Sequence, residues 1–440
     1  MTASPHVESA AGGAPTLRQI LLSPGYRRLL LLCLVLGVPI ALASYFFVSL
    51  QHVLEEWVWK SLPHAAGYDR APWWWPLPAL LLAGLILAPV VTRLPGRGGH
   101  VPVEGLGGAP IGPKALPGVA VVALAALPLG VVLGPEAPLM AVGSGLALLA
   151  VRALHRTSDA SSAALLATAG STTAISTIFG GPVVAAVMVV EGAGLAGVQL
   201  VALLLPCLLA SATGAVVFTG FGHWTGLPTG ALTLPDVPPN VTPDAGDFLW
   251  GVPAAALIAL VVAAGRAIGR RTQAAMRRHT APRTVAAAVA VGVCLTAYAL
   301  LTGRSPEEAA LSGQAVLGEL AARPESWSVA ALLALIACKG LAWAVCLGAL
   351  RGGPIFPSIL IGAATGIACA GLPGLGTTPG LALGMAAAAA AVTGLPLTSA
   401  VLAVLLLGQD AHHQMPLVVT AAVVAFVTAQ LVQRRPPGRA

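Results

Sequence analysis

Charged side chains are scarce in this chain of 440 residues. Asp, Glu, Lys and Arg make up 9% of it, whereas soluble domains contain about 25%. Residues 160–190, 192–235 and 352–409 contain none of the four. So little charge excludes an ordinary soluble domain. Together with an apolar content of 57%, it predicts an all-α polytopic membrane protein.

Paired metal or redox ligands are also missing. The six cysteines lie singly in apolar stretches without a C-x-x-C pair, and His412 and His413 have no further ligand at metal spacing. The sequence also has no pattern typical of a catalytic triad or a nucleotide-binding loop. We therefore expect no enzyme activity, no metal site and no cofactor.

The net charge of +7 does not indicate a nucleic-acid partner. Six arginines lie in residues 266–283, others flank the first and last apolar segments, and a loop at 234–247 is acidic. Basic loops of membrane proteins concentrate on the cytoplasmic side. This pattern predicts a multi-pass protein of the cell membrane with both termini in the cytoplasm and the 234–247 loop outside.

Glycine and proline, 51 and 36 residues respectively, interrupt the apolar stretches. Broken backbone within a membrane is tolerated where it is buried in protein or lines a wet cavity, so these interruptions indicate a transport path. The pattern predicts membrane segments at roughly 28–50, 73–92, 116–133, 137–151, 160–178, 181–191, 197–219, 248–269, 284–302, 327–349, 355–371, 380–392, 396–408 and 415–433.

Two Gly-Pro patterns recur in the same order in both halves of the chain. "GPEAPLMAVG" (134–143) resembles "GPIFPSILIG" (353–362), and "GGPVVAAVMVV" (180–190) resembles "GLPLTSAVLAV" (394–404). The charge pattern places the two ends of the first half on opposite sides of the membrane. The sequence therefore predicts an inverted repeat of tilted and broken helices, with a binding site near the midplane.

Each Gly-Pro pattern indicates the start of a helix. The first N–H groups of a helix lack internal partners and carry the positive end of its dipole, so they can bind an anion without a cationic side chain. Glu136, the single charge in its stretch, stands in such a first turn. Intramembrane carboxylates are functional by default, and we interpret Glu136 as a gate that competes with the anion and leaves when protonated.

These motifs resemble those of the CLC family of chloride channels and chloride/proton antiporters, over residues 27–433. The gating-glutamate motif of the family is matched by Gly134, Pro135, Glu136, Ala137 and Pro138. Its second motif is matched by Gly353, Pro354, Ile355, Phe356 and Pro357, and its G-S-G-I-P motif by Gly98, Gly99, His100, Val101 and Pro102. The resemblance implies a homodimer of the prokaryotic type, without CBS domains, that moves chloride or another small anion and in some members protons.

Several positions depart from the family pattern. The pore serine is replaced by Gly99, and no tyrosine stands near Ala411 and His412, where the pore tyrosine is expected. The inner proton glutamate of antiporters matches Gly192, although Glu191 lies beside it. We treat Glu191 and His412 as candidates for a proton route or inner gate, and His412 as a candidate pH sensor.

The sequence thus predicts anion transport through a pore gated by Glu136, as a channel or a loosely coupled transporter. We expect helix N-termini at 98–102, 134–138 and 353–357 to surround the anion. Two alternatives stay open: a chloride/proton antiporter, and a non-transporting membrane scaffold. The expected organisation is a cytoplasmic segment (1–27), a first membrane repeat (28–230), an extracellular linker (231–247), a second membrane repeat (248–433) and a cytoplasmic tail (434–440).

Overall fold

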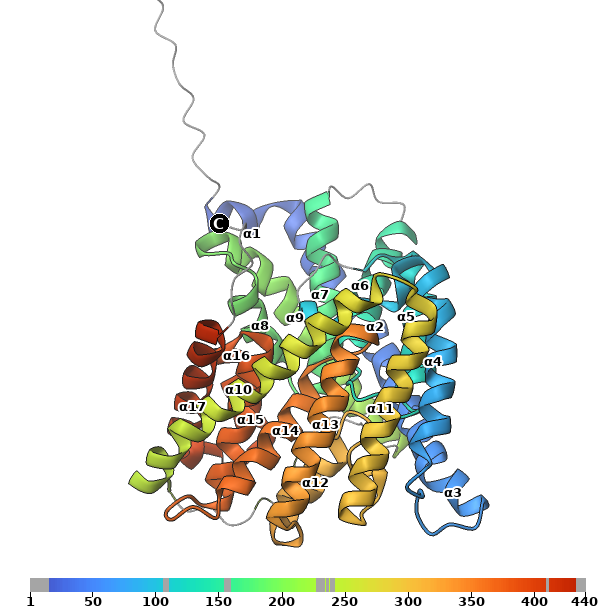
Figure 1. The fold of residues 1–440 in the computed structure, drawn as a ribbon. Coiled ribbons are helices and arrows are strands. Elements are labelled where there is room, and N and C mark those ends of the chain that lie inside the picture. Colours follow the sequence, from blue (N-terminus) through green and yellow to red (C-terminus); the bar gives the residue numbers. More distant parts are fainter. Residues whose placement is uncertain are drawn as a thin grey trace, which may run out of the picture.

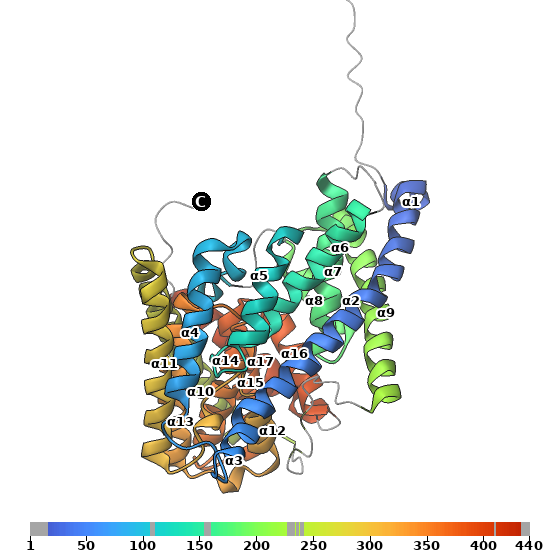
Figure 2. The same ribbon diagram turned by 90° about the vertical axis from the view of Figure 1, so that its right-hand side faces the viewer.

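A computed structural model describes residues 16–105, 111–153, 160–226, 234, 237, 242–408 and 411–432. Most of the expected linker 231–247 therefore lies outside the described residues, as do the tail 434–440 and residues 1–15. The described part is a bundle of helices, many of them strongly tilted (Figures 1 and 2). Eight of these helices are long and apolar enough to cross a membrane.

The first half contains α1 to α9. Their bounds are α1 Leu17–Leu22, α2 Pro24–Glu56, α3 Leu62–Ala65, α4 Pro76–Arg93, α5 Leu116–Val121, α6 Glu136–Ala153, α7 Ala160–Ile178, α8 Pro182–Gly192 and α9 Gly197–Thr225. The second half contains α10 Ala245–Met276, α11 Thr280–Thr302, α12 Gln314–Ala322, α13 Val329–Ala349, α14 Ile355–Cys369, α15 Thr377–Thr393, α16 Pro396–Leu407 and α17 Ala411–Val432.

The expected inverted repeat is present. In the first half α6 packs on α7, and α9 packs on α2, α7 and α8; in the second half α14 packs on α15, and α17 packs on α10, α15 and α16. The equivalent helices α2 and α10 run in opposite directions, α2 downward in Figure 2 and α10 upward in Figure 1. Since α4 also contacts its equivalent α11, and α8 its equivalent α16, an approximate two-fold axis relates the halves.

Glycines bring the equivalent helix pairs into backbone contact. A Cβ atom built on Gly143 of α6 would lie 2.2 Å from the carbonyl oxygen of Gly170 on α7, and one built on Gly362 of α14 would lie 2.3 Å from that of Gly384 on α15. Without a hydrophobic force between helices in lipid, such close packing is a main source of helix association. The two crossings fix the starts of α6 and α14, where the site lies.

Candidate anion site

The two Gly-Pro motifs of the repeat meet inside the fold. The N–H of Gly134 donates to the carbonyl of Gly353 over 2.8 Å, and the N–H of Gly353 donates to the carbonyl of Gly134 over 2.6 Å. Both glycines are buried. The bridge sets the starts of α6 and α14 side by side, and these starts contain the other predicted residues of the two motifs: Pro135, Ala137, Pro354, Ile355, Phe356 and Pro357.

Glu136, the first residue of α6, places its carboxylate at the N-terminus of α14. Its side chain has no exposed surface, and Oε1 accepts a hydrogen bond of 2.8 Å from the backbone N–H of Phe356. Oε2 is buried and has no hydrogen-bond partner among the described residues. The carboxylate therefore occupies the positive end of the α14 dipole, where an anion would also be stabilised.

The bridge glycines leave just enough room for this carboxylate. A Cβ atom would lie 1.8 Å from Oε2 if built on Gly353, and 2.1 Å from it if built on Gly134. No side chain other than hydrogen fits at these positions while Glu136 stays in place. The Gly of each Gly-Pro motif thus precedes a helix and also leaves space for the carboxylate of Glu136.

An aromatic contact joins the second repeated pattern to the site. The ring of Phe356, only 2% exposed, packs edge-on against the ring of Phe179, with 5.7 Å between centroids. Phe179 directly follows the last residue of α7 and precedes Gly180, Gly181 and Pro182. Phe179 was not predicted from the sequence, although its place beside a repeated Gly-Pro pattern was a usable signal.

The loop at residues 98–102 differs from expectation. It does not begin an α-helix: Pro102–Glu104 form a single 3₁₀ turn, and residues 106–110 lie outside the described part. Gly98 and Gly99 have φ values of 75° and 106°, in the left-handed region that favours glycine. The loop, which also contains His100 and Val101, lies beside Arg351, whose Nε donates to the carbonyl of Arg97 over 3.2 Å.

Glu191 lies at the start of α16. Its Oε1 accepts a 2.8 Å hydrogen bond from the N–H of Leu397, and its Oε2 accepts 2.7 Å bonds from the N–H and the hydroxyl of Thr398. Both oxygens thus cap the α16 N-terminus, and they bind α8 to α16. Geometry assigns Glu191 a structural contact, and its part in proton movement stays a prediction.

His412 lies in the first turn of α17 with an exposed side chain, and its ring contacts that of His413 at a tilt of 42°, with 3.8 Å between centroids. Asp410, the third residue of this group, lies outside the described residues. Leu417, one turn further along α17, packs against Gly251 near the start of α10, whereas Arg351 shares a cavity with the opposite end of α10. The structure therefore places His412 far from Arg351, at the other end of the molecule.

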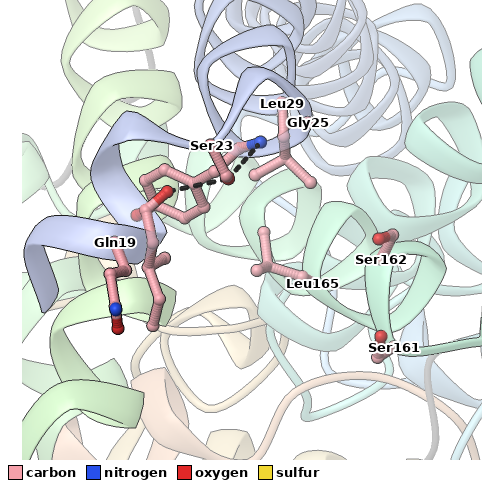
Figure 3. A pocket seen from close by; sticks show the side chains of 9 residues that line it. Gln19, Ser23, Gly25, Leu29, Ser161, Ser162 and Leu165 are labelled. Atoms are coloured by element: carbon pink, nitrogen blue, oxygen red, sulfur yellow. Dashed lines mark hydrogen bonds between the residues drawn. The ribbon is translucent and has the colours of Figure 1, made fainter. Parts of the chain in front are cut away.

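A separate cavity of about 510 Å³ lies between α1, the start of α2 and α7. Figure 3 shows its polar side chains, Gln19, Ser23, Ser161 and Ser162, with Leu29 and Leu165 among them. None of the nine residues that line it is charged. It shares no residue with the surroundings of Glu136.

Comparison with known proteins shows the family. The family model described as voltage gated chloride channel matches residues 103–430, about three quarters of the chain. The ion-transport proteins YfeO of Escherichia fergusonii and Escherichia coli O9:H4 are each 30% identical over 361 residues, covering 79% of this chain and 81% of the relative. The chain belongs to the CLC family.

Solved structures show the same fold. A slow cyanobacterial Cl⁻/H⁺ antiporter superposes with a TM-score of 0.74 at 17% identity, covering 94% of this chain and 96% of that one. A CLC-type fluoride/proton antiporter superposes with a TM-score of 0.68 at 18% identity, covering 91% and 95%. Family and fold together identify a multi-pass integral membrane protein of a family that transports anions.

Proposed function

We propose that this protein moves chloride or another small anion through a pore that Glu136 gates. The observation that carries the proposal is the buried Glu136 carboxylate on the N–H of Phe356 at the start of α14. The carboxylate and a permeating anion are stabilised there by the same N–H groups and dipole, so they exclude one another. Backbone donors hold an anion less tightly than Lys or Arg would, which allows it to leave again.

Protonation opens the gate in this mechanism. A neutral carboxylic acid loses its attraction to the helix dipole and to the N–H of Phe356, so its side chain can leave the α14 start. The vacated N–H groups then bind the anion. Oε2, which has no partner among the described residues, is the oxygen that can take up the proton without breaking a hydrogen bond. We therefore expect faster anion flux at acid pH.

The residues expected on the inner side of the path favour a channel or a loosely coupled transporter. Gly192 stands where antiporters of this family carry a proton-transferring glutamate, and Glu191 uses both carboxylate oxygens to cap α16. A proton route through Glu191 would require three hydrogen bonds to break. The competing function is a chloride/proton antiporter. It is favoured by the fold that this chain shares with the Cl⁻/H⁺ antiporter and the fluoride/proton antiporter described above.

The assembly and orientation that we propose are a homodimer in the cell membrane with both termini in the cytoplasm. The dimer is implied by the family. The orientation is supported by arginines in α1 and near the ends of α6 and α10, namely Arg18, Arg152, Arg270 and Arg277. Arginines of this kind concentrate on the cytoplasmic side of a membrane protein.

Anion efflux from liposomes, with external pH recorded, tests the proposal. Purified protein, the Glu136→Ala variant and protein-free liposomes are compared with chloride, nitrate and fluoride inside. Chloride flux without proton movement supports a gated channel, whereas protons driven uphill by a chloride gradient identify an antiporter. If no anion moves faster than in protein-free liposomes for either protein, the anion-transport proposal is wrong and a scaffold role takes its place.

A further inference from the structure

A second cavity, of about 400 Å³, lies where α4 and α13 end and where α10 is joined to α11. Three arginines line it: Arg97, Arg277 and Arg351. None of the three forms an ion pair within the described part of the chain, whose salt bridges join Lys60 to Glu56 and Arg304 to Glu308. A cavity of this size is large enough for a small organic or inorganic ligand and far larger than chloride requires.

Two backbone carbonyls hold the side chain of Arg351. Arg351 donates two hydrogen bonds: from Nε to the carbonyl of Arg97 over 3.2 Å, and from Nη1 to the carbonyl of Leu350 over 3.0 Å. Arg97 itself adopts a φ of 48°, which is unusual for a residue with a side chain. Backbone strain of this kind persists where the surrounding structure imposes it, often at ligand sites.

The charges in the cavity do not cancel. The positive charge of Arg97 lies close enough to Arg351 to act on it, and Glu104 is the acidic group that acts on Arg351 from nearby. Glu104 also accepts a 2.5 Å hydrogen bond from the amide of Gln273, another lining residue. Three cations against one carboxylate leave a charge that two negative charges on a ligand would neutralise.

The polar groups of the wall favour oxygen anions. The hydroxyls of Thr92 and Thr284 donate to carbonyls of their own helices, and the hydroxyl of Thr280 donates to the carbonyl of Met276 at the end of α10. The arginine side chains are therefore the charged donors that line the cavity. Guanidinium groups bind phosphate oxygens with paired hydrogen bonds. We propose that this arginine cavity binds a phosphate-bearing anion, carried either by a soluble compound or by a lipid headgroup.

The cavity and the anion site share one short segment of the chain. Arg351 stands two residues before Gly353, whose backbone forms the bridge to Gly134 beside Glu136. A phosphate-bearing anion bound at Arg351 would also neutralise part of the positive field near the path. Given the proposed transport function, we expect the bound phosphate to slow anion flux.

Binding is tested first in detergent, where no transport is needed. Inorganic pyrophosphate is titrated into the purified full chain at constant ionic strength set with chloride, and thermal unfolding is followed. We expect stabilisation that saturates with pyrophosphate. Arg277→Gln should weaken the apparent affinity about tenfold or more, because a hydrogen bond to a charged group contributes about 1.5–3 kcal/mol, whereas Arg277→Lys should weaken it less.

Arg278→Gln is the matched control, because Arg278 is the neighbouring arginine, exposed like Arg277, that does not line the cavity. It should bind pyrophosphate like the native chain. Equal stabilisation of native and Arg277→Gln proteins would mean that the anion binds elsewhere, and would overturn the site. A native chain that neither pyrophosphate nor phosphatidylglycerol affects would overturn it as well.

Efflux from liposomes separates the two sources of phosphate. Slower flux on adding pyrophosphate in phosphatidylcholine liposomes supports a soluble ligand. Slower flux in liposomes with phosphatidylglycerol, and no further effect of pyrophosphate, supports a lipid headgroup. Arg277→Gln should abolish either effect. Binding in detergent with unchanged flux in both liposomes would keep the site and overturn its link to transport.

Discussion

At the scale of single residues, the carboxylate of Glu136 decides how transport responds to pH. Glu136→Gln keeps a carbonyl oxygen for the N–H of Phe356 but is neutral at every pH. We expect anion efflux from liposomes to lose its acid activation and to stay near the fast acid rate from pH 5 to pH 8. A variant that still accelerates several-fold at low pH would assign the pH response to another group.

A second residue-scale prediction concerns Gly353. Gly353→Ala places a methyl group 1.8 Å from Oε2 of Glu136, so the carboxylate must move or the bridge must open. Overpacking of this kind costs about 1–3 kcal/mol. We expect a lower unfolding temperature for Gly353→Ala, measured in detergent.

Rescue by a second change makes this prediction specific. In Gly353→Ala combined with Glu136→Ala the obstructing carboxylate is gone, so the loss of stability should be smaller than the sum of the two single changes. Gly371→Ala, where a Cβ meets nothing within 4 Å, is the control for helix-terminal glycines. Additive losses in the double variant would contradict the contact.

At the scale of elements, Glu191 joins α8 to α16. Loss of a capping side chain costs about 0.5–2 kcal/mol, so Glu191→Ala should lower the unfolding temperature measurably, and Glu191→Gln, which keeps one oxygen acceptor, should lower it less. Glu325→Ala, an exposed carboxylate elsewhere, should leave it unchanged. Native stability in Glu191→Ala, together with lost proton movement, would instead assign Glu191 to a proton route.

Most helices could be predicted from sequence because Gly and Pro mark their ends. Residues 160–178 are helical as predicted, and the segments predicted at 396–408 and 355–371 match α16 and α14 within two residues. The segment predicted at 116–133 is too long, since its helix ends at Ala126 and turns follow up to α6. Apolar content alone does not distinguish a buried turn from a helix.

The geometry of the site was less accessible to sequence reasoning. The repeat predicted two helix starts around one anion, but the two-bond bridge from Gly134 to Gly353 depends on the two-fold arrangement of the halves. Phe179 and the arginine cavity were missed for the same reason: their residues come from elements far apart in the chain. Short helices such as α12 lack a long apolar period, so sequence did not predict them.

At the scale of the whole molecule, charge divides the two ends. Arginines stand at or directly after the ends of α4, α6 and α10. Acidic residues outnumber basic ones at the start of α10, after α11 and around α12, at the lower end in Figure 1: Asp244, Asp247, Glu307, Glu308, Glu319 and Glu325 against Arg304 and Arg323. Because basic loops stay in the cytoplasm during insertion, we expect the acidic end to face outward.

Labelling of single cysteines tests this orientation. In a variant whose six native cysteines are replaced, Glu325→Cys should react with a membrane-impermeant maleimide on intact cells. Arg278→Cys, between α10 and α11, should react only after the membrane is opened, and Gln19→Cys of α1 should behave like Arg278→Cys because both lie at the basic end. The reverse pattern would turn the arginine cavity toward the outside, where a cytoplasmic phosphate compound could not reach it.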